Sequence, residues 1–217
     1  MNLETAATTV IETITAMAGE GVPLMQRVLP EREAEHWKHY PKGDARDATC
    51  DSRWYYHVHA PGERAEGEHG HFHLFLCQKQ LGDVGEPIAW PVKPPRKGRR
   101  HADVTHIAGL SIDTVGIPRA WFVTNRWVTN EYLYPADVMI DHLDRFCVDD
   151  TPQDTLVNRC VTAMVALYRD ELSGLLRKRD DAMAPLLAEQ GSAAYEDKAH
   201  EILAEIPIDL DAKIASV

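Results

Sequence analysis

The stretch WYYHVHAPGERAEGEHGHFHLFLC, residues 54–77, decides the fold of this chain. Its two ends, 54–60 and 69–77, are rich in aromatic residues and alternate with a period of two. This pattern predicts two β-strands joined as an antiparallel hairpin. Segments of the same type at 104–113 and 119–129 predict that the hairpin belongs to a larger antiparallel sheet.

Histidines occupy one side of the hairpin. Residues i, i+2 and i+4 of a strand share a face, so His69, His71 and His73 project together, as do His57 and His59. A register with an even residue sum, such as 57 opposite 71, gathers all five imidazoles on one face, whereas an odd sum divides them between faces. The even register is favoured because it also unites the apolar residues of the opposite face, which are Tyr56, Val58, Phe72 and Leu74.

The segment 104–113 adds a sixth candidate imidazole. By simple alternation, His106 lies on the strand side that it shares with Ala108, Leu110 and Ile112. The sequence alone leaves open whether this side is the histidine side of the sheet.

This crowding of imidazoles predicts a metal site. Five of the 11 histidines fall within 17 residues. Protonated imidazoles repel one another, whereas neutral ones present several lone pairs to a small volume, which a divalent transition metal stabilises. Zinc, iron, copper and nickel all accept histidine, so the ligand type does not select the metal. The expected ligands come from His57, His59, His69, His71, His73 and His106, with Glu66, Glu68, Asp103 and Asp113 as candidate carboxylates.

The cysteines do not provide an alternative metal site. Cys50, Cys77, Cys147 and Cys160 are scattered and form no C-x-x-C pair, which is typical of reduced thiols.

Several other residues are candidates for a site on this face. His71 and Arg126 are the candidate catalytic groups, with Arg126 placed to clamp an anionic group of a small-molecule substrate. Tyr55, Phe75 and Trp127 would line a cofactor pocket, for which haem is the less favoured occupant. Residues 91–100 carry five cations and no acid, and this basic loop covers an anionic ligand, contacts an acidic partner or is a solvated loop.

Two resemblances follow from the motifs. HGHFHLF (69–75) resembles the H-x-H-x-H signature of the histidine-triad nucleotide hydrolases and transferases, which implies that His71 attacks phosphorus. More of the chain resembles an uncharacterised bacterial domain-of-unknown-function family, through HYPKGD (39–44), YYHVHAPGE (55–63), GEHGHFHLFL (67–76) and TNRWVTNE (124–131). That resemblance implies a single domain and no particular mechanism.

Composition and helical patterns define the remaining organisation. The net charge of −11 argues against a nucleic-acid binder, and the 44% hydrophobic content argues against disorder. No signal peptide or membrane span is expected, so the predicted location is cytoplasmic. We expect one α+β domain over 1–217: a helical segment (1–50) with helices at 3–17 and 24–37, a histidine-rich β region (51–134), a helical region (135–207) and a tail (208–217).

Three functions are consistent with this pattern. The first is a metalloenzyme that acts on a small molecule, anionic if Arg126 or the basic loop orients it. The second is a non-catalytic metal or haem carrier or sensor, and the third is metal-free histidine-triad chemistry on a nucleotide. The sequence does not decide among these reactions, nor does it define the oligomeric state.

Overall fold

The computed structural model describes residues 1–29, 34–60, 62–64, 66–94 and 102–217. Most of the basic loop expected at 91–100 lies outside the described residues. Within the described part of the chain, no helix combines the length and the apolar character that a bilayer crossing requires.

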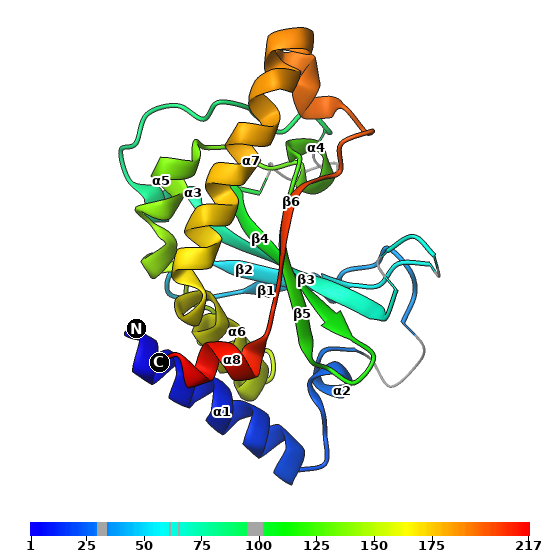
Figure 1. Cartoon of the computed structure of the whole chain (residues 1–217), viewed down its shortest axis with the longest axis vertical. Helices are drawn as coiled ribbons and strands as arrows, with labels where there is room; N and C mark the ends of the chain where they lie inside the picture. The colour runs from blue at the N-terminus through cyan, green and yellow to red at the C-terminus, as the bar shows by residue number, and fades with distance from the viewer. Residues whose placement is uncertain (30–33, 61, 65, 95–101) are drawn as a thin grey trace.

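A six-stranded antiparallel sheet forms the centre of the molecule (Figure 1). Its strands are neighbours in space in the order in which they occur along the chain. The expected α+β class with a central antiparallel sheet is therefore confirmed. The strands are β1 (Tyr40–Arg46), β2 (Arg53–His57), β3 (Glu68–Cys77), β4 (Val104–Asp113), β5 (Pro118–Thr124) and β6 (Ile202–Pro207).

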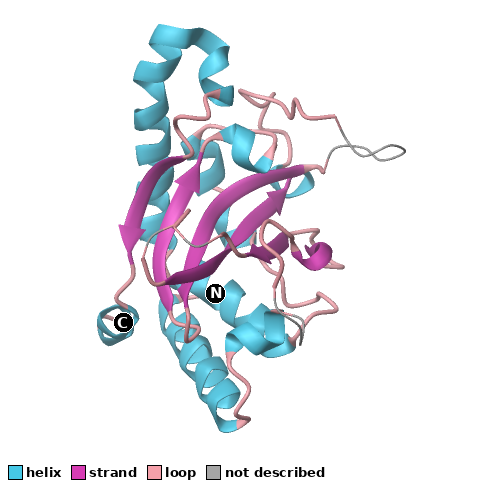
Figure 2. Ribbon diagram, turned by 90° about the vertical axis from the view of Figure 1, so that its right-hand side faces the viewer, coloured by secondary structure: helices cyan, strands magenta, loops and turns pink. Residues whose placement is uncertain are grey.

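Helices from both ends of the chain cover one face of this sheet, and the longest of them lies behind the strands in Figure 2. Helix α1 packs on α6, and α7 packs against β5 and β6. The described helices are α1 (Leu3–Gly19), α2 (Leu24–Val28), α3 (Gln78–Leu81), α4 (Arg126–Thr129), α5 (Ala136–Ile140), α6 (Thr155–Leu167), α7 (Arg169–Gln190) and α8 (Leu210–Ala215), with 3₁₀ turns at Leu143–Arg145 and Gly191–Glu196.

The covered face is the apolar face predicted from the sequence. Tyr56, Phe72 and Leu74 are fully buried there against the helices. Trp54 is also buried, and its indole Nε1 donates a hydrogen bond to Oδ1 of Asn158 on α6 at 3.1 Å. Burying a large aromatic side chain contributes roughly 2–3 kcal/mol, so this face fixes which side of β2 and β3 points away from the helices.

The register of the hairpin confirms the even-sum prediction. His57 pairs with His71, and Tyr56 pairs with Phe72. The face opposite the helices therefore carries His57, His71 and His73, and we call it the histidine face.

Both ends of the chain differ from the sequence-based expectation. Of the predicted helix over 24–37, the structure forms α2, whereas residues 34–37 are not helical and residues 30–33 lie outside the described part of the chain. HYPKGD begins the edge strand β1, where an edge position tolerates Pro41 and Gly43. The helical region predicted over 135–207 is wrong at its end as well. Its C-terminal part is strand β6, whose residues Ala204 and Ile206 pack against the core with a period of two. The expected tail contains helix α8.

Candidate metal centre

A β-bulge at the start of β3 changes which acidic and histidine side chains reach the histidine face. Glu68 pairs with Asp113 and Gly70 pairs with Ile112, so the register shifts at His69. His69 consequently leaves the histidine face, and its Nδ1 lies 2.9 Å from the hydroxyl of Tyr56. The expectation that His69 projects together with His71 and His73 is therefore wrong. The side chain of Glu68 projects onto the histidine face instead and contacts His71.

A second bulge, in β4, brings His106 to the histidine face. Leu74 pairs with Ala108, whereas the next residue, Phe75, pairs with His106, so one residue of β4 is skipped. His106 therefore does not share a side with Ala108, which belongs to the core. The expected sixth imidazole thus joins the histidine face, but through an irregularity that simple alternation does not contain.

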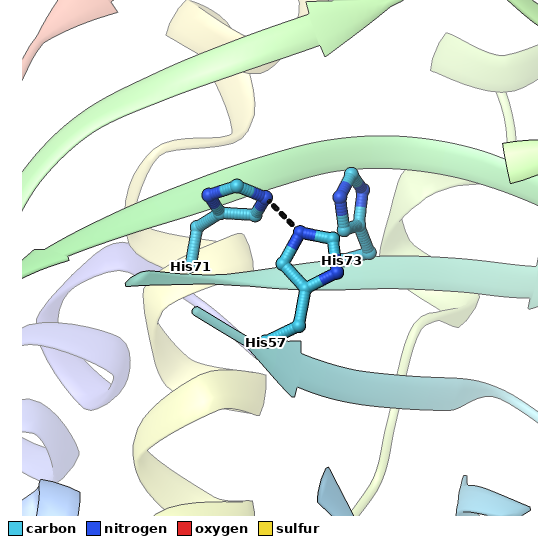
Figure 3. Close-up of side chains that lie close together, drawn as sticks. All are labelled: His57, His71 and His73. Carbon is cyan, nitrogen blue, oxygen red and sulfur yellow. Dashed lines mark hydrogen bonds between the residues drawn. The ribbon is translucent and has the colours of Figure 1, made fainter. Parts of the chain in front are cut away.

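The imidazoles of β2 and β3 converge on one point (Figure 3). His57, His71 and His73 are buried, and each offers a ring nitrogen within 4.8 Å of the other two. The Nε2 atoms of His57 and His71 are 2.6 Å apart, and Nε2 of His59 lies 3.1 Å from Nε2 of His57. Two nitrogens that bind one tetrahedral ion at about 2.0–2.1 Å lie about 3.3 Å apart, so this cluster could hold a metal ion with small adjustments.

Glu68 orients His71. Its Oε1 lies 2.8 Å from Nδ1 of His71, and its Oε2 accepts a hydrogen bond from the hydroxyl of Ser111 at 2.7 Å. The guanidinium Nε of Arg64 donates to Oε1 at 3.1 Å. Burial raises the pKa of Glu68, but the hydrogen bonds from His71, Arg64 and Ser111 outweigh it and lower that pKa to about 2. The ionised carboxylate holds the proton of His71 on Nδ1 and leaves its Nε2 as a lone pair, as in carboxylate–histidine–metal arrangements.

His106 supports His73 in the same manner. Its Nε2 lies 2.9 Å from Nδ1 of His73, and its Nδ1 lies 3.4 Å from the hydroxyl of Thr124. The backbone N–H of His106 donates to the buried carboxylate of Glu131, which fixes the bulge. With Nδ1 engaged, Nε2 is the nitrogen that His73 offers to an ion.

The five clustered imidazoles are neutral at pH 7. Burial is the main cause, and it lowers the pKa of His57 to about 2, that of His59 to about 4 and that of His106 to about 3. The neighbouring imidazoles lower the pKa of His57 further. The pKa values of His71 and His73 are also lowered by burial. The histidine face therefore presents uncharged lone pairs, which is the protonation state that metal binding needs.

A count of ring protons points to a shared cation. A neutral imidazole nitrogen carries either one proton or one lone pair. Nε2 of His57 lies between Nε2 of His71 and Nε2 of His59, and one proton on it can serve only one of these two contacts. A metal ion that bound Nε2 of His57 and Nε2 of His71 would accept both of these lone pairs.

Small residues make room for this arrangement. A Cβ on Gly70 would overlap the carbonyl oxygen of His57, so glycine permits the close approach of β2 and β3. A Cβ on Gly109 would overlap the ring of Phe122, which packs edge-on against His71 with 4.9 Å between ring centroids.

The other predicted site residues divide into two groups. Tyr55 and Phe75 are buried beside the cluster, and the Tyr55 ring lies 5.0 Å from that of His73. Arg126 and Trp127 form their hydrogen bonds with residues outside the histidine cluster. The buried guanidinium of Arg126 donates to Oδ1 of Asn130 at 3.2 Å and forms an ion pair with Glu196. The indole Nε1 of Trp127 donates to the carbonyl oxygen of His200 at 3.4 Å.

Sequence reasoning missed Arg64 and Ser111. Ser111 pairs with His71 across β3 and β4. The alternating patterns of these two strands are compatible with this register, and they are the signal that could have identified Ser111. Arg64 precedes Glu68 by four residues and is fixed to it by two hydrogen bonds. No strand or helix pattern covers Arg64, so the sequence contained no comparable signal.

A pocket of about 560 Å³ opens beside the cluster. His59 and Glu68 belong to both the cluster and the lining of the pocket, and Arg64, Glu66 and His69 line it as well. This volume is within the range of small-molecule sites. The pocket therefore borders the edge of the histidine cluster.

Comparison with known proteins places the chain in one family. The family model described as Domain of unknown function (DUF6969) matches residues 4–208. The chain therefore belongs to this family, and the expected membership in an uncharacterised family is confirmed. No curated protein and no solved structure matches the chain.

Proposed function

We propose that this member of the DUF6969 family binds one divalent transition-metal ion through Nε2 atoms of His57, His71 and His73. The observation that carries the proposal is the convergence of three buried imidazole nitrogens within 4.8 Å. Glu68 and His106 support the proposal, because each hydrogen-bonds the remaining ring nitrogen of a ligand. Such outer partners fix the ring orientation of metal-binding histidines.

We further propose that the ion is catalytic. Three protein ligands leave one position of a tetrahedral ion for water or substrate, which distinguishes catalytic from structural zinc sites. The pocket lined by His59 lies beside the cluster and supplies the route for a small molecule. The bound ion would lower the pKa of its water or polarise an oxygen of the substrate.

The same geometry disfavours histidine-triad chemistry. That mechanism uses neighbouring histidines of one strand face to position phosphate oxygens around the nucleophile. Here His69 has left the face, and Nε2 of His71 lies 2.6 Å from Nε2 of His57. The lone pair that would attack phosphorus is therefore directed at another imidazole.

The metal content of protein purified without a histidine tag tests the proposal. We expect about one zinc, iron, copper or nickel ion per chain by elemental analysis after dialysis, and no Soret absorption. His200→Ala removes a partly exposed histidine that contacts Asp197 outside the cluster and the pocket, and it should retain the same content. Metal in clearly less than stoichiometric amount, in protein offered each ion in turn, would contradict the proposal, and a Soret band would instead favour a haem carrier.

A further inference from the structure

Arg64 is held beside the proposed metal position as a prearranged cation. Its side chain is only 11% exposed, and its guanidinium lies 4.7 Å from the ring centroid of Phe122. Nε and Nη2 donate to the two carboxylate oxygens of Glu68 at 3.1 and 3.4 Å. Within the described part of the chain, no hydrogen-bond partner is present for Nη1. This edge of the guanidinium is therefore available to a ligand in the pocket that Arg64 lines.

A second group in the same pocket also lacks a partner. The side chain of His59 is 5% exposed, and its buried Nδ1 forms no hydrogen bond within the described residues. The nearest carboxylate oxygen, from Glu63, is 3.9 Å away, which is too far for one. An unsatisfied buried polar atom costs about 1–3 kcal/mol, and a polar ligand atom in the pocket would remove this cost.

The charges of the pocket define the ligand. Arg64, Glu66 and Glu68 line it and together carry one negative charge, leaving the imidazoles aside. A divalent ion bound to the neutral histidines changes this charge to +1, because the ion is the largest local charge. One further anionic group restores neutrality, and the lining residues Ala34, Val58 and Ala60 provide an apolar surface for the rest of the molecule.

We propose that the metal-loaded pocket binds a small monocarboxylate, with one carboxylate oxygen accepting a hydrogen bond from Nη1 of Arg64. This inference rests on the proposed metal site, because without the ion the pocket is negative. Arg64 is then a residue that determines substrate specificity, in the role that the sequence assigned to Arg126. A carboxylate fits better than a phosphate dianion, because one guanidinium edge and a net charge of +1 match a single negative charge.

Calorimetric titration of the metal-loaded protein tests the carboxylate. The ligands are a series from acetate to benzoate, their neutral amides and inorganic phosphate. We expect at least one carboxylate to bind about tenfold or more tightly than its amide, and Arg64→Gln to weaken it about 10- to 100-fold, as loss of a charge-assisted hydrogen bond does. Arg159→Gln makes the same change at a partly exposed arginine of α6 and should leave binding unchanged.

Metal content is measured separately on every variant. A loaded wild type that binds no carboxylate more tightly than its amide, or that prefers phosphate, overturns the carboxylate proposal and leaves the metal site intact. Equal binding by loaded Arg64→Gln also overturns it. A wild type that takes up no metal overturns the proposed function and this inference with it. The comparison of carboxylates with amides needs only the wild type, so it decides the question even if Arg64→Gln fails to fold.

Discussion

His71→Ala is expected to abolish the thermal stabilisation that a transition-metal ion gives the wild-type protein. An ion that binds only the folded state stabilises it by about 4 kcal/mol at a free concentration a thousandfold above Kd. For a chain of this size, that corresponds to a rise in Tm of roughly 8–16 °C. Removal of Nε2 of His71 deletes a ligand that lies 2.6 Å from Nε2 of His57, so the rise should disappear.

Two further variants test how the metal-dependent rise in Tm depends on the residues around the site. Glu68→Gln keeps every proposed ligand but removes the carboxylate that orients His71, and it should weaken metal binding about 10- to 100-fold. His200→Ala alters a partly exposed histidine outside the cluster and the pocket and should behave as wild type. Melting curves of each variant, with and without added metal and with chelator, give the comparison. An undiminished metal-dependent rise in Tm for His71→Ala would remove His71 from the set of ligands.

The metal-free protein is expected to unfold cooperatively as the pH falls from about 6.5 towards 4. Burial keeps the pKa values of His57, His59, His71, His73 and His106 below the ordinary value of 6.5. Below pH 6.5 the unfolded chain therefore binds protons that the folded chain does not, and each such group costs about 1.4 kcal/mol of stability per pH unit.

Two buried carboxyl groups also change how stability depends on pH: Glu131 opposes the loss caused by the histidines, and Glu68 adds to it at lower pH. Burial raises the pKa of Glu131 from its ordinary value of 4.5 to about 7. The stabilising contribution of this carboxyl therefore grows as the pH falls from 7 to 4.5. The lowered pKa of Glu68 adds stability above pH 4.5 that is lost as the pH falls towards 2. His57, His59, His73 and His106, against the opposing Glu131, lower the free energy of unfolding by about 4 kcal/mol per pH unit, and the lowered pKa of His71 adds to this loss. This loss exceeds a stability of about 5–15 kcal/mol within roughly one to four pH units.

Circular dichroism during acid titration measures this transition. His106→Gln removes one buried imidazole and should shift the unfolding midpoint to lower pH, whereas His200→Ala, outside the cluster, should not move it. The prediction fails if the metal-free wild type remains folded at pH 4. Bound metal should shift the midpoint to lower pH, because protons compete with the ion for the same lone pairs.

The regular part of the sheet could be predicted from the sequence because one face must be apolar. Phe72 and Leu74 have to be buried together with Tyr56, and only an even register achieves this. The same requirement places His57 opposite His71, which is the pairing in the folded sheet. The strand 104–113 follows from the same reasoning, and its bounds agree with β4.

The two bulges could not be predicted, because a pattern with a period of two contains no information about where one residue is skipped. Alternation placed His69 on the histidine face and His106 on the side of Ala108. In the structure, the contact of His69 with Tyr56 and the hydrogen bond from the backbone of His106 to Glu131 accompany these shifts. Both contacts join residues that are 13 or more positions apart, so they depend on the folded sheet.

The direct test of the metal centre is X-ray absorption spectroscopy of the wild-type protein loaded with one equivalent of Zn²⁺. The proposed site predicts at least three imidazole nitrogens at about 2.0–2.1 Å, and a spectrum of His73→Ala should contain one imidazole fewer. A first shell made only of oxygen atoms, or one that contains sulfur, would contradict a metal site built from His57, His71 and His73.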